Sequence, residues 1–226
     1  MTASRATLSE SAKLFVRRAI RRVGRFAALA ILALPAVAFP AATEVRTLVF
    51  LGDSLTAGYG LNPDEAFPAL IQRKIDEVRL PWRVVNAGLS GETTAGGLRR
   101  LDWILRQRID LLVIELGGND GLRGLSPVDT RANLQNIIDR VRAKQPAAQI
   151  ILAGMQMPVN MGPEYTREFA AVYPALAKQS RVRLIPFLLE GVGGRPELNQ
   201  PDGIHPTAEG HRIVAETVWK ALTPLL

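Results

Sequence analysis

Asp110-Leu-Leu-Val-Ile-Glu-Leu116, followed directly by Gly117-Gly-Asn-Asp120, is the most apolar of the strand-like runs and ends in a pair of glycines. A run of this length and composition predicts a strand that is buried on both faces of a parallel sheet. Similar runs predict four further strands, at residues 45–51, 83–86, 149–153 and 182–185.

Stretches with helical periodicity separate these strands. Apolar residues recur every three or four positions within 65–79, 98–105, 130–144, 164–179 and 213–222. Five strands that alternate with five helices predict an α/β fold of three layers, α/β/α, with a five-stranded parallel sheet covered on both faces. Such sheets place their ligand sites at the carboxyl ends of the strands.

The composition limits the chemistry that is available. The 226 residues suit one globular domain, and 47% apolar against 22% charged residues exclude a disordered chain. The absence of cysteine excludes disulfides, thiolate metal sites and a cysteine nucleophile. With only two histidines, His205 and His211, a metal site built from several histidines is not expected.

The formal net charge of +7 is concentrated at the N-terminus. Residues 1–43 hold seven basic residues against Glu10, a net charge of +6, which leaves +1 for residues 44–226. The globular part therefore lacks the bulk positive charge that draws proteins to phosphate backbones, and we do not expect nucleic acid as a partner.

The N-terminal stretch has the composition of an export signal. An arginine-rich region ends at Arg25, an uncharged run covers 26–42, and Ala36-Val-Ala38 offers the small residues that a signal peptidase reads. We predict a cleaved signal peptide over 1–43 and a periplasmic or secreted domain over 44–226. The apolar run is marginal against the roughly 20 residues of a spanning helix, and an uncleaved anchor is the alternative.

Polar motifs follow three of the strands and precede the last helix. They are Gly52-Asp-Ser-Leu55, Asn86-Ala-Gly-Leu-Ser-Gly91, Gly117-Gly-Asn-Asp120 and Asp202-Gly-Ile-His205. The first motif has neither the Gly-Lys-Ser/Thr of a P-loop nor a dinucleotide-binding G-x-G-x-x-G. Thr56 stands where the G-x-S-x-G elbow needs its second glycine, which argues against the ordinary α/β-hydrolase fold.

The four motifs, in this order, resemble those of the SGNH, or GDSL, family of serine esterases. The likeness is greatest to its branch of periplasmic acyl-thioesterases, lysophospholipases and arylesterases. The matching stretches are 50–59, 89–93, 113–123 and 202–206, which extend across residues 45–226. The resemblance implies a flavodoxin-like sheet, no cofactor or metal, and hydrolysis of ester or thioester bonds in a small-molecule substrate.

The chemistry of the residues indicates how such hydrolysis would proceed. The hydroxyl of Ser54 is a poor nucleophile that needs an adjacent base, and His205 is the better candidate of the two histidines. Asp202 can accept a hydrogen bond from the other ring nitrogen and so fix the tautomer. The resemblance further implies an oxyanion hole made of the backbone N–H groups of Ser54 and Gly91 and the side-chain amide of Asn119.

Each of these residues also has an ordinary structural role open to it. Ser54 could cap a helix, Asn119 could form an Asx turn, Gly91 could serve a turn, and His205 beside Pro206 could shape a helix entry.

Three further titratable residues are not expected to take part in the chemistry. His211 is predicted to be a surface or packing residue of the last helix. Asp53 and Asp120 are predicted to bind backbone N–H groups of loops and to hold the shape of the site, instead of forming a metal or acid–base pair.

The segment after the fourth strand is predicted to line the part of the site that binds the substrate. Met155, Met157 and Pro158 would form an adaptable apolar wall for an acyl chain, with plain core filling as an equally good interpretation. We expect a monomeric, exported esterase of broad acyl specificity that meets a membrane only transiently, through its signal peptide or a lipid substrate. A carbohydrate O-acetyl esterase and a non-catalytic acyl or lipid carrier are the alternatives.

Overall fold

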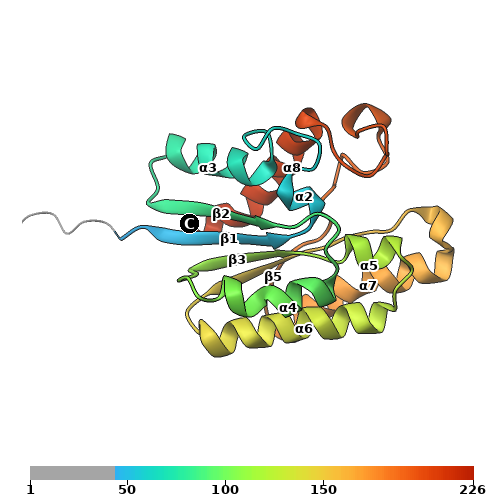
Figure 1. Cartoon of the computed structure of the whole chain (residues 1–226), viewed down its shortest axis with the longest axis horizontal. Helices are drawn as coiled ribbons and strands as arrows, with labels where there is room; N and C mark the ends of the chain where they lie inside the picture. Colours follow the sequence, from blue (N-terminus) through green and yellow to red (C-terminus); the bar gives the residue numbers. More distant parts are fainter. Residues whose placement is uncertain (1–43) are drawn as a thin grey trace, which may run out of the picture. The chain divides into compact units, whose positions relative to one another are not determined.

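A parallel sheet forms the centre of the structure, a computed structural model that describes residues 44–226 (Figure 1). Its strand order is β2-β1-β3-β4-β5. The strands are β1 Arg46–Gly52, β2 Trp82–Gly88, β3 Leu111–Glu115, β4 Gln149–Ala153 and β5 Arg183–Ile185. All neighbours pair in parallel, so the predicted five-stranded parallel sheet is confirmed. The predicted signal peptide over 1–43 lies outside the described residues.

The long helices cover the two faces of the sheet, as Figure 1 shows. Helices α3 (Phe67–Glu77) and α8 (Ala208–Leu222) pack together on one face. Helices α4 (Thr94–Ile104), α6 (Pro127–Lys144) and α7 (Pro163–Ser180) cover the other. The three-layer α/β/α prediction is therefore confirmed. No helix within residues 44–226 combines the length and the apolar character needed to cross a membrane.

The prediction of five helices was too low, because two short helices begin within the polar motifs. Helix α2 (Ser54–Ala57) begins directly after β1, and α5 (Gly118–Leu122) begins just after β3. Helices of four and five residues are too short to show an apolar repeat. Three single turns of 3-10 helix complete the described chain: η1 Val159–Met161, η2 Pro196–Leu198 and η3 Thr223–Leu225.

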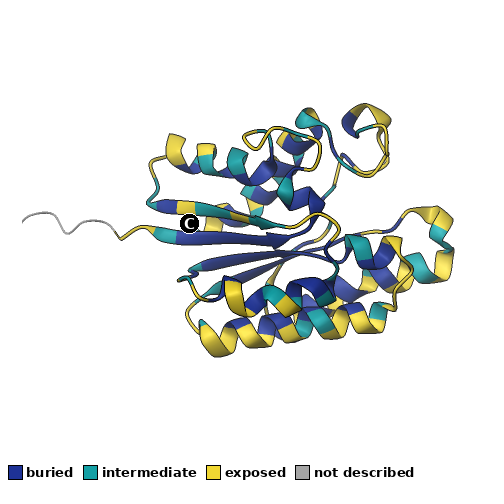
Figure 2. Ribbon diagram, in the orientation of Figure 1, coloured by how far each residue is buried: buried dark blue, intermediate teal, exposed yellow. Residues whose placement is uncertain are grey.

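The core follows from the position of each strand in the sheet. Residues of the central strands β1 and β3 are almost entirely buried, because each has a neighbouring strand on both sides and helices over both faces (Figure 2). Gly52 at the end of β1 lies in register with Gly88 of β2 and with Glu115 of β3. Three strands thus end at one level, and the loops that carry the polar motifs leave from the same edge.

His211 is a packing residue, as predicted, and it also caps a helix. It lies on α8 with 1% of its surface exposed, and its Nδ1 atom accepts a hydrogen bond of 3.1 Å from the backbone N–H of Phe67, the first residue of α3. Burial, aided by the nearby His205, lowers the pKa of His211 to about 4. The native state is therefore more stable when the His211 ring is neutral, because protonation would place a charge in the core.

Acidification should destabilise the protein through His211. The stability that comes from the depressed pKa is complete above the unfolded value of about 6.5 and is lost as the pH falls toward 4, about 2 kcal/mol of it between pH 7 and pH 5. In His211→Gln the amide oxygen can accept the Phe67 N–H and does not titrate, so this loss should disappear. Urea unfolding at both pH values measures it, and equal losses in wild type and variant would contradict the assignment.

Candidate active site

Three side chains from two distant parts of the chain form a continuous hydrogen-bonded row. Ser54 Oγ lies 2.9 Å from His205 Nε2, and His205 Nδ1 lies 2.7 Å from Asp202 Oδ2. Ser54 is the first residue of α2, whereas Asp202 and His205 belong to the loop before α8. The structure thus brings together a hydroxyl, an imidazole and a carboxylate in the order that a nucleophile, a base and an orienting acid require.

The turn that presents Ser54 is built by its neighbours. Asp53 caps α2, because its Oδ1 accepts the backbone N–H of Leu55 at 3.0 Å. The alternative that Ser54 is the cap is therefore wrong, and its hydroxyl is free to face His205. A Cβ at Gly52 would lie 2.0 Å from Thr56 Oγ1 and 2.5 Å from a carboxylate oxygen of Glu115, so only glycine fits there.

Asp202 fixes the orientation of the imidazole. Its hydrogen bond with the His205 ring, aided by the backbone N–H groups of Ile204 and His205, lowers the pKa of Asp202 to about 2. Asp202 therefore stays ionised at neutral pH and holds Nδ1 protonated, which leaves Nε2 as the acceptor toward Ser54. The ring of Tyr59 packs against the imidazole, with 4.5 Å between ring centroids.

The three expected oxyanion donors differ in their present partners. Within the described residues, the backbone N–H groups of Ser54 and Gly91 donate to no backbone or side-chain acceptor. The amide of Asn119 donates from Nδ2 to Asp53 Oδ2, at 3.1 Å, and to the backbone carbonyl of Glu92, at 3.0 Å. Asn119 is thus held by two other loops and not by a local Asx turn.

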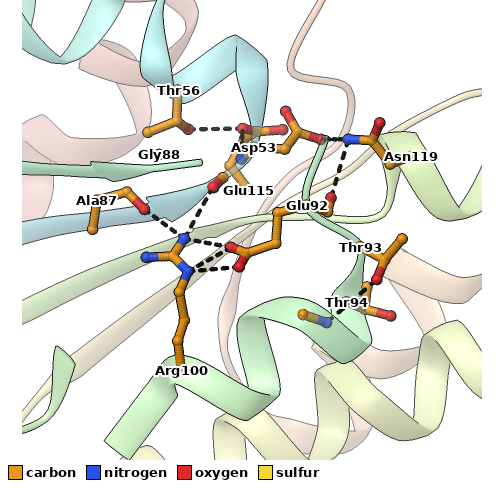
Figure 3. Close-up of polar contacts among 12 residues, drawn as sticks. Asp53, Thr56, Ala87, Gly88, Glu92, Thr93, Thr94, Arg100, Glu115 and Asn119 are labelled. Atoms are coloured by element: carbon orange, nitrogen blue, oxygen red, sulfur yellow. Dashed lines mark hydrogen bonds and ion pairs between the residues drawn. The ribbon is translucent and has the colours of Figure 1, made fainter. Parts of the chain in front are cut away.

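An ion pair that the sequence analysis missed anchors the loop that contains Gly91. Arg100 Nε lies 2.7 Å from both carboxylate oxygens of Glu92, and Nη2 donates to the carbonyl of Ala87 at 2.7 Å and to that of Gly52 at 3.3 Å (Figure 3). Residues 92 and 100 straddle the start of α4, so no helical spacing signals the pair.

Asp53 and Asp120 hold loops, as predicted. Asp120 accepts hydrogen bonds from the backbone N–H of Thr94, at 2.8 Å, and from its hydroxyl, at 2.5 Å. Among residues 44–226 no group of three or more acidic or histidine side chains is arranged to hold a metal ion.

A cavity of about 610 Å³ opens beside Ser54 and His205. Met155, Met157 and Pro158 line it, together with Val159, Phe187 and Leu189 from the same side of the sheet edge. Met155 and Met157 are only 4% and 8% exposed and also belong to the core. The apolar wall and the core-filling interpretation therefore both describe these methionines.

The family model of GDSL-like lipases and acylhydrolases matches residues 50–213, most of the described chain and all four polar motifs. The chain belongs to this family. Esterase TesA of Pseudomonas aeruginosa is 44% identical over 182 residues, which cover 80% of this chain and 90% of that protein. Thioesterase 1/protease 1/lysophospholipase L1 of Escherichia coli is 41% identical over 186 residues, which cover 82% and 87%.

The crystal structure of TesA superimposes on this member of the GDSL-like family with a TM-score of 0.77 at 44% identity, over 80% of this chain and 100% of that one. The predicted family, fold class and reaction class are thereby confirmed: the chain is an ester or thioester hydrolase of the SGNH type that acts on small molecules.

The missed ion pair predicts a large loss of stability in Arg100→Met. Glu92 is 7% exposed, and removal of the guanidinium leaves its carboxylate buried without a cation, which costs about 3 kcal/mol. The double variant Glu92→Gln/Arg100→Met should recover part of this loss, because no unpaired charge remains. Denaturant unfolding measures both, and an Arg100→Met variant as stable as wild type would contradict the assignment.

Proposed function

We propose that residues 44–226 hydrolyse acyl esters and thioesters through a covalent acyl-Ser54 intermediate. The observation that carries this proposal is the 2.9 Å contact between Ser54 Oγ and His205 Nε2, continued by the 2.7 Å contact between His205 Nδ1 and Asp202. A serine hydroxyl becomes a nucleophile at neutral pH only beside a base of this kind.

Acylation begins when Ser54 Oγ attacks the carbonyl carbon of the substrate. His205 Nε2 takes the hydroxyl proton and becomes an imidazolium, which the ionised Asp202 stabilises. The tetrahedral intermediate then collapses, and the imidazolium returns the proton to the departing alcohol or thiol. Water attacks the acyl-enzyme by the same route in reverse, with His205 again as the base.

The oxyanion of each tetrahedral intermediate would be bound by the N–H groups of Ser54 and Gly91 and by Asn119. Since both hydrogens on Asn119 Nδ2 are engaged, one must change partner. The Glu92 carbonyl is neutral, whereas a charged Asp53 carboxylate is a stronger acceptor, so the contact with Glu92 is the one released. Loss of one such donor typically lowers turnover by about 10²–10³-fold.

The apolar cavity would receive the acyl chain. Met155, Met157 and Pro158 border the space beside Ser54, and unbranched methionine side chains adapt to chains of different length. Broad acyl specificity follows from such a wall. An aromatic content of 6% gives little support to stacking on a sugar ring.

The site would work outside the cytoplasm. Residues 1–43 have the basic start, apolar run and small-residue exit of a signal peptide, so 44–226 is the proposed mature, monomeric enzyme. Its formal charge of +1 supports a neutral or lipid-like substrate over nucleic acid, and contact with a membrane would be transient.

A fluorophosphonate probe tests the proposal. Purified residues 44–226 should cleave p-nitrophenyl acyl esters, and the probe should label Ser54 by mass mapping. Ser54→Ala should lose both the label and the turnover while it stays folded, since within residues 44–226 no other hydroxyl is hydrogen-bonded to the imidazole. Ser90→Ala, which removes another hydroxyl that lines the same cavity, should keep the label.

Other outcomes would favour the alternatives. A folded protein that binds fatty acids but turns over no ester would be a carrier, and turnover limited to acetyl groups would indicate an O-acetyl esterase of carbohydrates.

A further inference from the structure

Two buried carboxyl groups adjoin Ser54, and the mechanism above assigns neither of them a proton. Asp53 precedes Ser54, and Glu115 ends β3 in register with Gly52. Their exposed fractions are 2% and 0%. Such a pair needs an explanation, because an ionised carboxylate loses its hydration at this depth.

Glu115 holds the turn that carries Ser54 (Figure 3). Its Oε2 atom accepts hydrogen bonds from the backbone N–H of Asp53, at 3.2 Å, and from the hydroxyl of Thr56, at 2.7 Å. One oxygen therefore binds the residues on both sides of Ser54. The other oxygen, Oε1, is the buried side-chain polar atom that has no such hydrogen bond among the described residues.

No cation neutralises the two acids. Within residues 44–226 neither Asp53 nor Glu115 forms a salt bridge with lysine or arginine. Arg100, which reaches the carbonyl of Gly52, directs its other donors to Glu92 and the Ala87 carbonyl.

The remaining titratable groups around the pair do not supply a fixed positive charge. On the α7 side the buried phenol of Tyr173, close to both acids and to Asp120, donates its hydrogen to the Leu116 carbonyl. His205 faces Asp53 and is positive only when it has taken a proton.

Like charges that share a buried site ionise one at a time. Burial raises the pKa of Asp53 to about 6, although the hydrogen bonds that its carboxylate accepts from the backbone N–H of Leu55 and the amide of Asn119 act in the opposite direction. Burial and the charge of Asp53 together raise the pKa of Glu115 well above its ordinary value.

We infer that Glu115 is a positioning residue that keeps its proton during catalysis, so that the buried pair carries one negative charge, on Asp53. That charge orients the amide of Asn119, which lies 3.1 Å from Asp53 Oδ2, and favours the imidazolium that forms on His205. Glu115 thus holds the turn that carries Ser54, and the charge on Asp53 holds the oxyanion donor Asn119. The kinetic part of this inference rests on the proposed function, whereas the protonation state does not.

Infrared difference spectroscopy at neutral pH tests the protonation state without reference to activity. When the spectrum of Glu115→Gln is subtracted from that of the wild type, the difference should show the C=O stretch of a protonated carboxyl and no carboxylate bands. The matched control is Glu197→Gln, whose exposed carboxyl has its pKa lowered by its own backbone N–H and by Arg195, and which should show carboxylate bands instead. Carboxylate bands in the Glu115→Gln difference would overturn the inference.

Kinetics with a p-nitrophenyl ester test the positioning role. Glutamine can accept and donate hydrogen bonds as the protonated acid does. Glu115→Gln should therefore keep kcat within about tenfold of the wild-type value, and its rate should fall with acidification at the same pH as in the wild type. Glu115→Leu removes the hydrogen bonds to the turn and should lower kcat by about 10²-fold, with KM little changed because the cavity walls are intact.

A purely structural role would move the unfolding temperature of both variants but would not separate their kcat values. Equal losses of kcat in the two variants, or a shifted acid limb in Glu115→Gln, would contradict the inference. If the leucine variant fails to fold, the spectrum and the glutamine variant decide the matter. If the wild type proves inactive but the protonated-carboxyl band is present, the proposed function fails and the protonation state stands.

Discussion

The parallel register between β1 and β3 is the constraint on which the site depends. It sets Gly52 opposite Glu115 at the carboxyl edge of the two central strands, where a side chain larger than hydrogen would collide with Glu115 and Thr56. The carboxyl group that fills this space accepts hydrogen bonds from Asp53 and Thr56 in the turn into α2, and Ser54 lies between them with its hydroxyl toward His205. A shift of one residue in this register would turn the side chains of the shifted strand to the opposite face and would separate Gly52 from Glu115.

The polar cluster at this edge is supported by the apolar layers behind it. The central strands β1 and β3 are buried along most of their length, and a close-packed interior of this kind tolerates little displacement. Side chains of loops from four parts of the chain can therefore be held at hydrogen-bonding distance from one another. The Glu92–Arg100 pair fixes the Gly91 loop, and Asp120 fixes the start of α4, so the loops hold one another as well as resting on the sheet.

Sequence periodicity predicted the sheet and the long helices because their apolar repeats cover many residues. It missed α2 and α5, which contain a single turn each, although these helices carry Ser54 and Asn119. The motif positions predicted which residues would lie at the carboxyl edge, since parallel strands end on the same side. Partner choice was not predictable: the sequence analysis did not single out Glu115, and nothing local indicates that its partners are Asp53 and Thr56. The same holds for Arg100 and Glu92, whose contact depends on tertiary packing.

The central claim is that the loops at this edge form one site around the Ser54 hydroxyl and a space for a negative oxygen. A crystal structure of residues 44–226 reacted with an alkyl phosphonate tests it most directly, because the tetrahedral adduct has the shape of the intermediate. The account predicts phosphorus bonded to Ser54 Oγ and a phosphonyl oxygen about 3 Å from the nitrogen atoms of Ser54, Gly91 and Asn119. The Asn119 contact with the Glu92 carbonyl should be lost while the contact with Asp53 is kept. A phosphonyl oxygen turned away from these donors, or an adduct on a different residue, would contradict the account.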